Sequence, residues 1–184
     1  GDHKIVVLAV DGAKVEMTKR VISAGLRPYG LDIAAKGEVA VVANIGVRGQ
    51  GMRVAIVDTG IDYTHASFGG EGTVEAYEAN DPTFIEPDSF PTDKVIGGFD
   101  FVGNNYDVLD DDPDNDVPRP DFDPLDSDGH GTHTGSTVAG IAVAGEVGKG
   151  VAPRALLYAY KVWDEGNSTD DVLVAAYERA MDPN

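Results

Sequence analysis

The hydrophobic pattern divides the chain into two parts of different character. The first 46 residues contain four short segments rich in apolar and β-branched residues, and turn signals such as Asp11-Gly12 and Lys36-Gly37 separate them. Short strands with turns every eight to twelve residues are typical of an antiparallel meander. We therefore predict strands over 4–10, 15–22, 26–33 and 38–44.

After Gly51 the pattern changes to continuous apolar strands that alternate with amphipathic helices. The predicted strands are 52–57, 95–102 and 155–162, and the predicted helices are 130–144 and 169–181. Strands that alternate with helices form βαβ units, so we predict an α/β fold with a parallel sheet and flanking helices, preceded by a short antiparallel β segment. The stretch 71–128 is rich in Pro, Asp and Gly and is predicted to form surface loops.

The change of character predicts two domains, residues 1–46 and 47–184. Either the natural chain joins two domains near residue 46, or two unrelated segments have been joined artificially. Residues 25–44 resemble the repeat of YVTN-type β-propellers, and residues 1–45 would be one blade of such a propeller. The unit occurs once, and one blade cannot close a propeller because neighbouring repeats bury its core.

Negative charge is concentrated in one region. The formal net charge is -18, and residues 71–128 hold 18 acidic and 2 basic residues, which is -16 of that total. Such a field repels nucleic acid and anionic lipid, so we expect neither nucleic acid nor a membrane as a partner. The absence of cysteine excludes disulfides, thiolate catalysis and cysteine-ligated zinc.

Two residues occupy places where chemistry is expected. Asp58 follows an apolar strand, and the carboxyl ends of parallel strands are where open α/β sheets hold their sites. His130 opens a predicted helix between Gly129 and Gly131, and these glycines let other segments approach the imidazole closely. The structural alternatives are a turn cap for Asp58 and a packed helix start for His130.

The segments around both residues resemble the subtilisin family of serine peptidases. The matching segments are Val57-Asp58-Thr59-Gly60-Ile61-Asp62, His130-Gly131-Thr132-His133 with Val138-Ala139-Gly140, Gly150-Val151-Ala152-Pro153, and Leu157-Tyr158-Ala159-Tyr160-Lys161-Val162. The resemblance covers roughly residues 46–184. It implies that Asp58 orients the imidazole and that His130 is first a general base and then a general acid. It also implies hydrolysis of a protein or peptide substrate by a secreted, extracellular enzyme.

The family's third motif, a Gly-Thr-Ser-Met-type turn, has no counterpart in this sequence. Ser136 lies within the helix that His130 begins and cannot turn back to the imidazole, and Ser168 is interpreted as a helix cap. The family's oxyanion asparagine also falls after Asn184. We therefore expect a fragment of a catalytic domain that is inactive alone and whose partner is a complementing C-terminal fragment. The alternative is a non-catalytic binding or structural module with a subtilisin-like remnant.

Two metal hypotheses follow from the sequence. His130 and His133 are three residues apart, whereas the zinc-peptidase helix motif needs a spacing of four and a glutamate. We therefore expect His133 to pack or to form hydrogen bonds at the helix start. Asp110, Asp112, Asp114 and Asp116 offer the oxygen ligands that calcium prefers, and subtilisin-like enzymes often bind calcium.

The calcium hypothesis has features against it. No glycine or closing glutamate completes an EF-hand loop in the acidic run, and Ser67 stands where many relatives carry an aspartate ligand. We favour a solvated acidic loop to which Asp121, Asp123 and Asp126 also belong, with calcium binding as the alternative.

Overall fold

The computed structural model describes residues 4–11, 14–23, 28–33, 40–44, 48–109, 111–164 and 167–181. Its internal contacts divide the chain into two compact units, Gly1–Arg48 and Gly49–Asn184. Each unit is described by itself.

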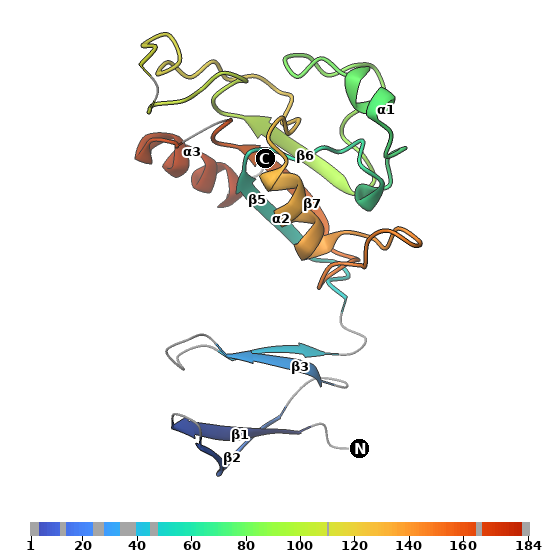
Figure 1. Cartoon of the computed structure of the whole chain (residues 1–184), viewed down its shortest axis with the longest axis vertical. Helices are drawn as coiled ribbons and strands as arrows, with labels where there is room; N and C mark the ends of the chain where they lie inside the picture. Colours follow the sequence, from blue (N-terminus) through green and yellow to red (C-terminus); the bar gives the residue numbers. More distant parts are fainter. Residues whose placement is uncertain are drawn as a thin grey trace. The chain divides into compact units, whose positions relative to one another are not determined.

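The first unit contains two antiparallel strand pairs (Figure 1). Strand β1 (Lys4–Asp11) pairs with β2 (Lys14–Ser23), and β3 (Pro28–Ile33) pairs with β4 (Ala40–Asn44). The strands lie where the alternation of apolar segments and turns predicts them. The described strands pair two by two rather than as one four-stranded blade, and the propeller interpretation stays a prediction.

The second unit is built on a three-stranded parallel sheet in the order β5-β7-β6. Strand β5 (Arg53–Asp58), β6 (Val95–Asp100) and β7 (Leu156–Lys161) lie within two residues of the predicted strands. In the pairing register Lys161 of the central strand lies opposite both Asp58 and Asp100. Polar residues therefore end all three strands at the same edge of the sheet.

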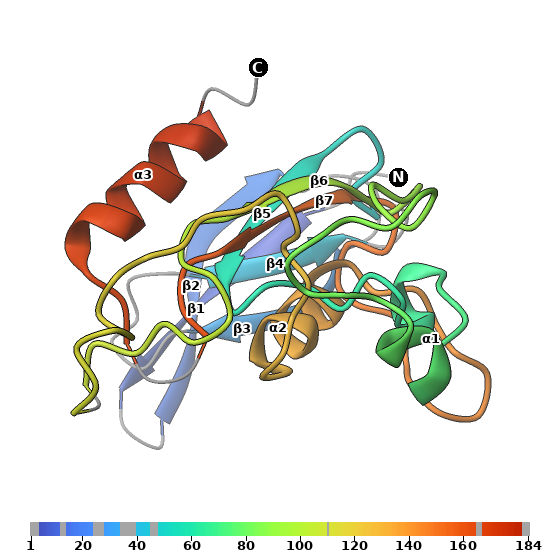
Figure 2. The ribbon, with the colours of Figure 1, turned by 90° about the horizontal axis from the view of Figure 1, so that it is seen from above.

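Two helices cover opposite faces of this sheet (Figure 2). Leu157 and Ala159 of the central strand pack in one apolar cluster with α2 (His130–Ala139), whereas Tyr160 packs in a second cluster with α3 (Asp170–Met181). A sheet that is buried on both faces requires the continuous apolar strands seen in the sequence. The predicted α/β fold, a parallel sheet with flanking helices, is confirmed. None of the described helices has the length and apolar character needed to cross a membrane.

Helix α2 ends at Ala139, earlier than the predicted end at residue 144. The N–H of Val151 donates to the carbonyl of Thr137 at 3.0 Å. The N–H of Ala152 donates to the carbonyl of Val138 at 2.8 Å. The returning chain thus satisfies carbonyls that a further helical turn would otherwise bond, and the helix stops there.

The stretch 71–128 contains more structure than the predicted surface loops. Besides β6 it forms the short helix α1 (Val74–Glu78), which begins where the Thr73 hydroxyl accepts the N–H of Ala76 at 3.1 Å. A 3-10 turn, η1 (Ala66–Phe68), precedes it. Hydroxyl capping of this kind stabilises even a one-turn helix, although its five residues are too few for a periodic signal.

Two acids that the sequence assigns to a solvated acidic loop are buried instead. Asp123 is 1% exposed and Asp126 is 3% exposed. The Tyr63 hydroxyl contacts both carboxyl oxygens of Asp123, at 3.0 and 3.1 Å. Asp126 accepts hydrogen bonds from the segments around His130. Buried carboxyl groups persist where donors replace the lost water, and these two acids have such donors.

Candidate active site

The structure brings Asp58 and His130 together at the carboxyl edge of the sheet. Oδ1 of Asp58 lies 2.7 Å from Nδ1 of His130. The same oxygen accepts the N–H of Thr59 at 2.8 Å, which holds the carboxyl group in place. The Asp58 side chain is 8% exposed and the His130 side chain is 62% exposed. A buried acid therefore contacts an imidazole that faces solvent.

Close contact between glycines allows this approach. A Cβ atom on Gly131 would lie 2.0 Å from the carbonyl oxygen of Gly60, and this contact leaves no space for a side chain. Gly60 itself has φ +108°, in the region that favours glycine. The backbone of Gly60, which follows Thr59, thus packs against the backbone of Gly131, which follows the predicted site residue His130.

The environment of His130 favours its charged form. The hydrogen bond that His130 donates to Asp58, followed by the charge of the same carboxylate, raises the pKa of the His130 imidazole. Asp128 and Asp126 raise this pKa further through their charges, in that order. An imidazole that bonds a carboxylate through Nδ1 can accept a proton at Nε2, and the resulting cation is stabilised.

An open cavity of about 230 Å³ lies beside the imidazole. It is lined by Thr59, Asp128, His130, Trp163 and Asp164. The described part of the chain places no hydrogen-bond partner on Nε2 of His130. The imidazole therefore lies beside space that a reacting group can enter.

None of the described serine hydroxyls bonds to His130. Ser136 donates to the carbonyl of His133 at 2.9 Å within α2, and Ser127 contacts Lys161 and Asp164. The hydroxyl of Ser168, interpreted from the sequence as a helix cap, is buried without a hydrogen-bond partner. Of the other serines whose side chains the structure describes, Ser67 has a buried hydroxyl without a hydrogen-bond partner, and Ser89 donates to the carbonyl of Glu86 at 2.9 Å. The described residues thus offer no activated nucleophile to the imidazole.

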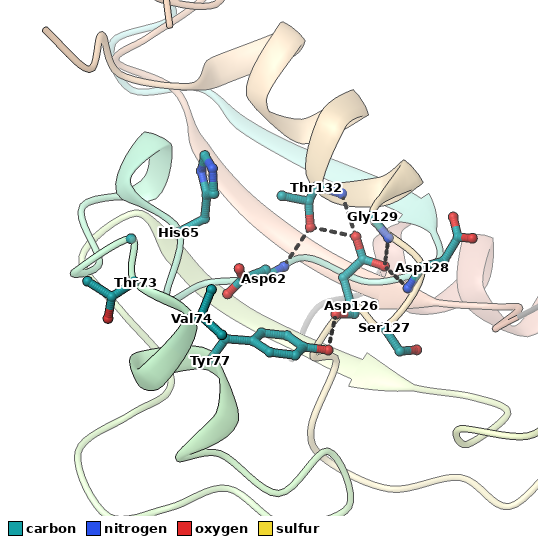
Figure 3. Close-up of a pocket in the computed structure, with 11 residues that line it drawn as sticks. Asp62, His65, Thr73, Val74, Tyr77, Asp126, Ser127, Asp128, Gly129 and Thr132 are labelled. Atoms are coloured by element: carbon teal, nitrogen blue, oxygen red, sulfur yellow. Dashed lines mark hydrogen bonds between the residues drawn. The ribbon is translucent and has the colours of Figure 1, made fainter. Parts of the chain in front are cut away.

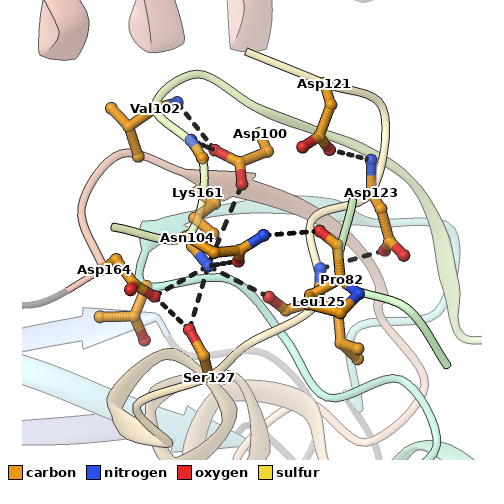
Figure 4. Close-up of polar contacts among 12 residues, drawn as sticks. Pro82, Asp100, Val102, Asn104, Asp121, Asp123, Leu125, Ser127, Lys161 and Asp164 are labelled. Carbon is orange, nitrogen blue, oxygen red and sulfur yellow. Dashed lines mark hydrogen bonds and ion pairs between the residues drawn. The ribbon is translucent and has the colours of Figure 1, made fainter. Parts of the chain in front are cut away.

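A buried lysine that the sequence analysis did not single out as a site residue lies at the same sheet edge (Figure 4). Nζ of Lys161 lies 3.0 Å from Oδ1 of Asp164, 2.6 Å from Oδ1 of Asn104 and 3.1 Å from Oγ of Ser127. Lys161 is 0% exposed, and a buried ion of this kind persists only when it is paired and hydrogen-bonded. A lone lysine at the end of an apolar strand was the available sequence signal.

The described part of the chain contains no cluster of metal-ligating side chains of the kind that the two metal hypotheses require. No group of three or more His, Cys, Asp or Glu side chains that could hold a metal ion occurs there. Asp110 lies outside the described residues, and Asp112, Asp114 and Asp116 are exposed. Calcium binding stays a prediction. His133, expected to pack or bond at the helix start, is exposed, and its N–H donates to the carbonyl of Gly129 at 3.0 Å.

Comparison with known proteins identifies the same region. Residues 49–184 match the profile described as the Subtilase family. Minor extracellular protease Vpr of Bacillus subtilis (strain 168) is 35% identical over 140 residues, which is 75% of this chain and 13% of that protein. Subtilisin-like protease SBT4.15 of Arabidopsis thaliana is 33% identical over 139 residues, which is 70% of this chain and 17% of that protein.

A third relative extends the likeness to another bacterium. Thermophilic serine proteinase of Bacillus sp. (strain AK1) is 31% identical over 122 residues, which is 64% of this chain and 20% of that protein. The chain thus spans a fifth or less of the length of these three relatives.

Proposed function

Because the chain belongs to the subtilase family, we propose that residues 49–184 supply the acid and the base of a peptide-hydrolysing Ser-His-Asp triad. The observation that carries the proposal is the 2.7 Å contact between Asp58 Oδ1 and His130 Nδ1. This bond presents Nε2 of His130 to the open cavity as the proton acceptor. His130 removes the proton of a serine hydroxyl and later gives it to the leaving amine, while Asp58 stabilises the imidazolium.

The nucleophile of the proposed reaction comes from polypeptide outside these 184 residues. The described serine hydroxyls make other contacts or are buried away from the imidazole. The oxyanion-stabilising side chain comes from the same outside polypeptide. The 184 residues by themselves form no acyl-enzyme and hydrolyse no peptide, because both steps need the missing serine.

The proposed substrates are proteins or peptides, and the proposed location is outside the cell. Both come from the relatives, whose names describe proteases and, for the Bacillus subtilis protein, an extracellular one. Residues 49–184, which match the Subtilase family profile, include both Asp58 and His130.

A chimera tests the catalytic assignment. Residues 49–184 replace the matching stretch of the Bacillus subtilis protease, and we expect the remaining chain of that protease to supply the serine. We expect the chimera to hydrolyse a peptide substrate and to react with a fluorophosphonate that labels activated serines. His130→Ala should lower kcat by about 10⁶-fold and Asp58→Asn by about 10⁴-fold, the magnitudes being those known for subtilisin itself.

The matched control in the chimera is His133→Ala, which removes an exposed imidazole from the same helix. We expect its kcat to stay within about twofold, because a change in an exposed side chain away from the reacting atoms alters little. The isolated 184-residue chain should remain unlabelled by the fluorophosphonate. Labelling of that chain, or hydrolysis by the chimera that survives His130→Ala, would contradict the proposal.

A further inference from the structure

Figure 3 shows the Asp126 carboxylate at the centre of hydrogen bonds from Asp128, Gly129 and Thr132, the residues on either side of His130. Its Oδ1 accepts the Thr59 hydroxyl at 2.7 Å and the N–H of Gly129 at 3.0 Å. Oδ1 also accepts the N–H of Asp128 at 3.1 Å. Its Oδ2 accepts both the N–H, at 2.8 Å, and the hydroxyl of Thr132. Every partner is a donor, so the site requires a group that accepts on both oxygens.

These bonds join the two segments that carry the acid and the base. Thr59 follows Asp58 directly, and its hydroxyl accepts the N–H of Gly131 at 2.8 Å. The Thr132 hydroxyl accepts the N–H of Asp62 at 2.8 Å. The end of β5 and the first turn of α2 are therefore connected through one buried carboxylate.

Apart from Asp58, the described residues restrain the His130 imidazole little. Its side chain is 62% exposed, and its one hydrogen bond to a described residue is the bond to Asp58. The direction of that bond depends on where the first turn of α2 lies relative to the end of β5. The carboxylate of Asp126 bonds to both segments and is 3% exposed, so water competes little for its hydrogen bonds.

We propose that Asp126 is a positioning residue that keeps Nδ1 of His130 bonded to Asp58. The inference rests on the proposed function for its catalytic meaning, and it concerns the same site. Asp126 touches no reacting atom. It acts by joining Thr59 to the residues on both sides of His130, so that the imidazole keeps its Nδ1–H tautomer and leaves Nε2 free for proton transfer.

The test is the tautomer of His130 in the ¹⁵N-labelled 184-residue chain, read from imidazole nitrogen shifts above its pKa. We expect the Nδ1–H tautomer to dominate in the unchanged chain and to become the minor form in Asp126→Asn. An asparagine at this position would point its NH₂ group toward hydrogen-bond donors, so the hydrogen bonds that one of the two carboxylate oxygens accepts would be lost.

Asp128→Asn is the matched control. Asp128 raises the pKa of His130 through its charge more than Asp126 does. If Asp126 acted only through charge, Asp128→Asn would lower that pKa further than Asp126→Asn and neither variant would change the tautomer. Retention of the Nδ1–H tautomer in Asp126→Asn, together with the smaller fall in pKa, would overturn the proposal.

If Asp126→Asn does not fold, as judged by the NMR signals of the backbone amides of β6, a second pair of variants tests the proposal. Thr132→Val removes the hydroxyl that bonds Asp126 and Asp62, whereas Thr132→Ser keeps it. We expect the tautomer to shift in the valine variant alone, and equal behaviour of the two variants would contradict the inference. Since no readout is activity, an inactive chimera would end the catalytic proposal and leave this result standing.

Discussion

At the scale of single residues, the bond between His130 and Asp58 makes a prediction about titration. Asp58 is the main cause of the raised pKa of His130. Asp58→Asn should therefore lower the pKa of this imidazole toward its ordinary value near 6.5. Histidine titration by NMR measures the change, with Glu146→Gln, an exposed acid that does not act on His130, as the control. Equal pKa values in both variants would contradict the assignment.

The same pKa has a consequence for stability. The folded chain binds the His130 proton more tightly than the unfolded chain, because the folded pKa is raised. The associated stabilisation is therefore fully present below the unfolded pKa of about 6.5 and is lost as the pH rises through the folded pKa.

The buried carboxyl group of Asp123 should give the free energy of unfolding a second pH dependence, at lower pH than that of His130. Burial raises the pKa of its carboxyl group to about 7, although the bond from Tyr63 opposes the rise. Unfolded aspartate titrates near 3.9, so the folded chain keeps a proton that the unfolded chain releases. The free energy of unfolding should fall by on the order of a few kcal/mol as the pH rises from about 4 to about 7.

Urea unfolding over this pH range provides the measurement. Asp123→Asn, which imitates the protonated carboxyl group, should flatten the pH dependence. Asp93→Asn removes an exposed acid and should leave it unchanged. Burial also raises the pKa of Asp100, to about 6, so some of the slope should remain in the Asp123 variant. A slope that is the same in both variants would rule out Asp123 as a source.

At the scale of secondary structure elements, the glycine contact between β5 and α2 is the feature most sensitive to substitution. Gly131→Ala places a Cβ atom 2.0 Å from the Gly60 carbonyl, and neither backbone can move without separating the two segments. We expect a loss of about 3 kcal/mol or more in the free energy of unfolding. Chemical unfolding at constant pH measures it.

Gly148→Ala is the matched control for this substitution. Nothing lies within 4 Å of a Cβ atom on Gly148, and its φ is not positive. The change in the free energy of unfolding should stay within about 0.5 kcal/mol. A loss in Gly131→Ala no larger than that in Gly148→Ala would contradict the role assigned to the contact with Gly60.

The elements also explain which sequence predictions succeeded. Strands β5, β6 and β7 are apolar on both sides because helices cover both faces, so their apolar runs identify them. The end of α2 was predicted too late, because backbone donors from Val151 and Ala152, which no helical periodicity reveals, complete its last turn. Contacts between distant segments set this boundary.

At the scale of the whole molecule, the charge distribution predicts a response to salt. Residues 71–128 carry -16 of the net charge of -18, and like charges on one region repel each other. Raising NaCl from about 0.05 M to about 0.5 M at pH 7.5 should raise Tm by a few degrees, because screening weakens this repulsion. Differential scanning calorimetry measures Tm in both solutions.

The control is the same experiment near pH 4.3, the isoelectric point that the sequence gives. The net charge is then close to zero, and the added salt should change Tm much less. A salt effect of equal size at both pH values would show that the acidic region does not limit stability.

The sequence by itself determined the class of the fold, the family and the two residues that meet at the sheet edge. Local patterns are sufficient for this, because strand ends, glycine-flanked turns and motif order are written in neighbouring residues. The assignment of 1–46 and 47–184 as domains stays a prediction.

The tertiary structure alone decided the roles of the buried acids. Asp123 and Asp126 belong to an acid-rich stretch that composition assigns to a solvated loop, yet both are buried. Whether a carboxylate faces water or five donors depends on segments up to 67 residues away in the chain, as for Thr59 and Asp126. Four of the five donors lie within six residues of Asp126, but the Thr59 hydroxyl is distant in the chain, and only folding brings it to the carboxylate.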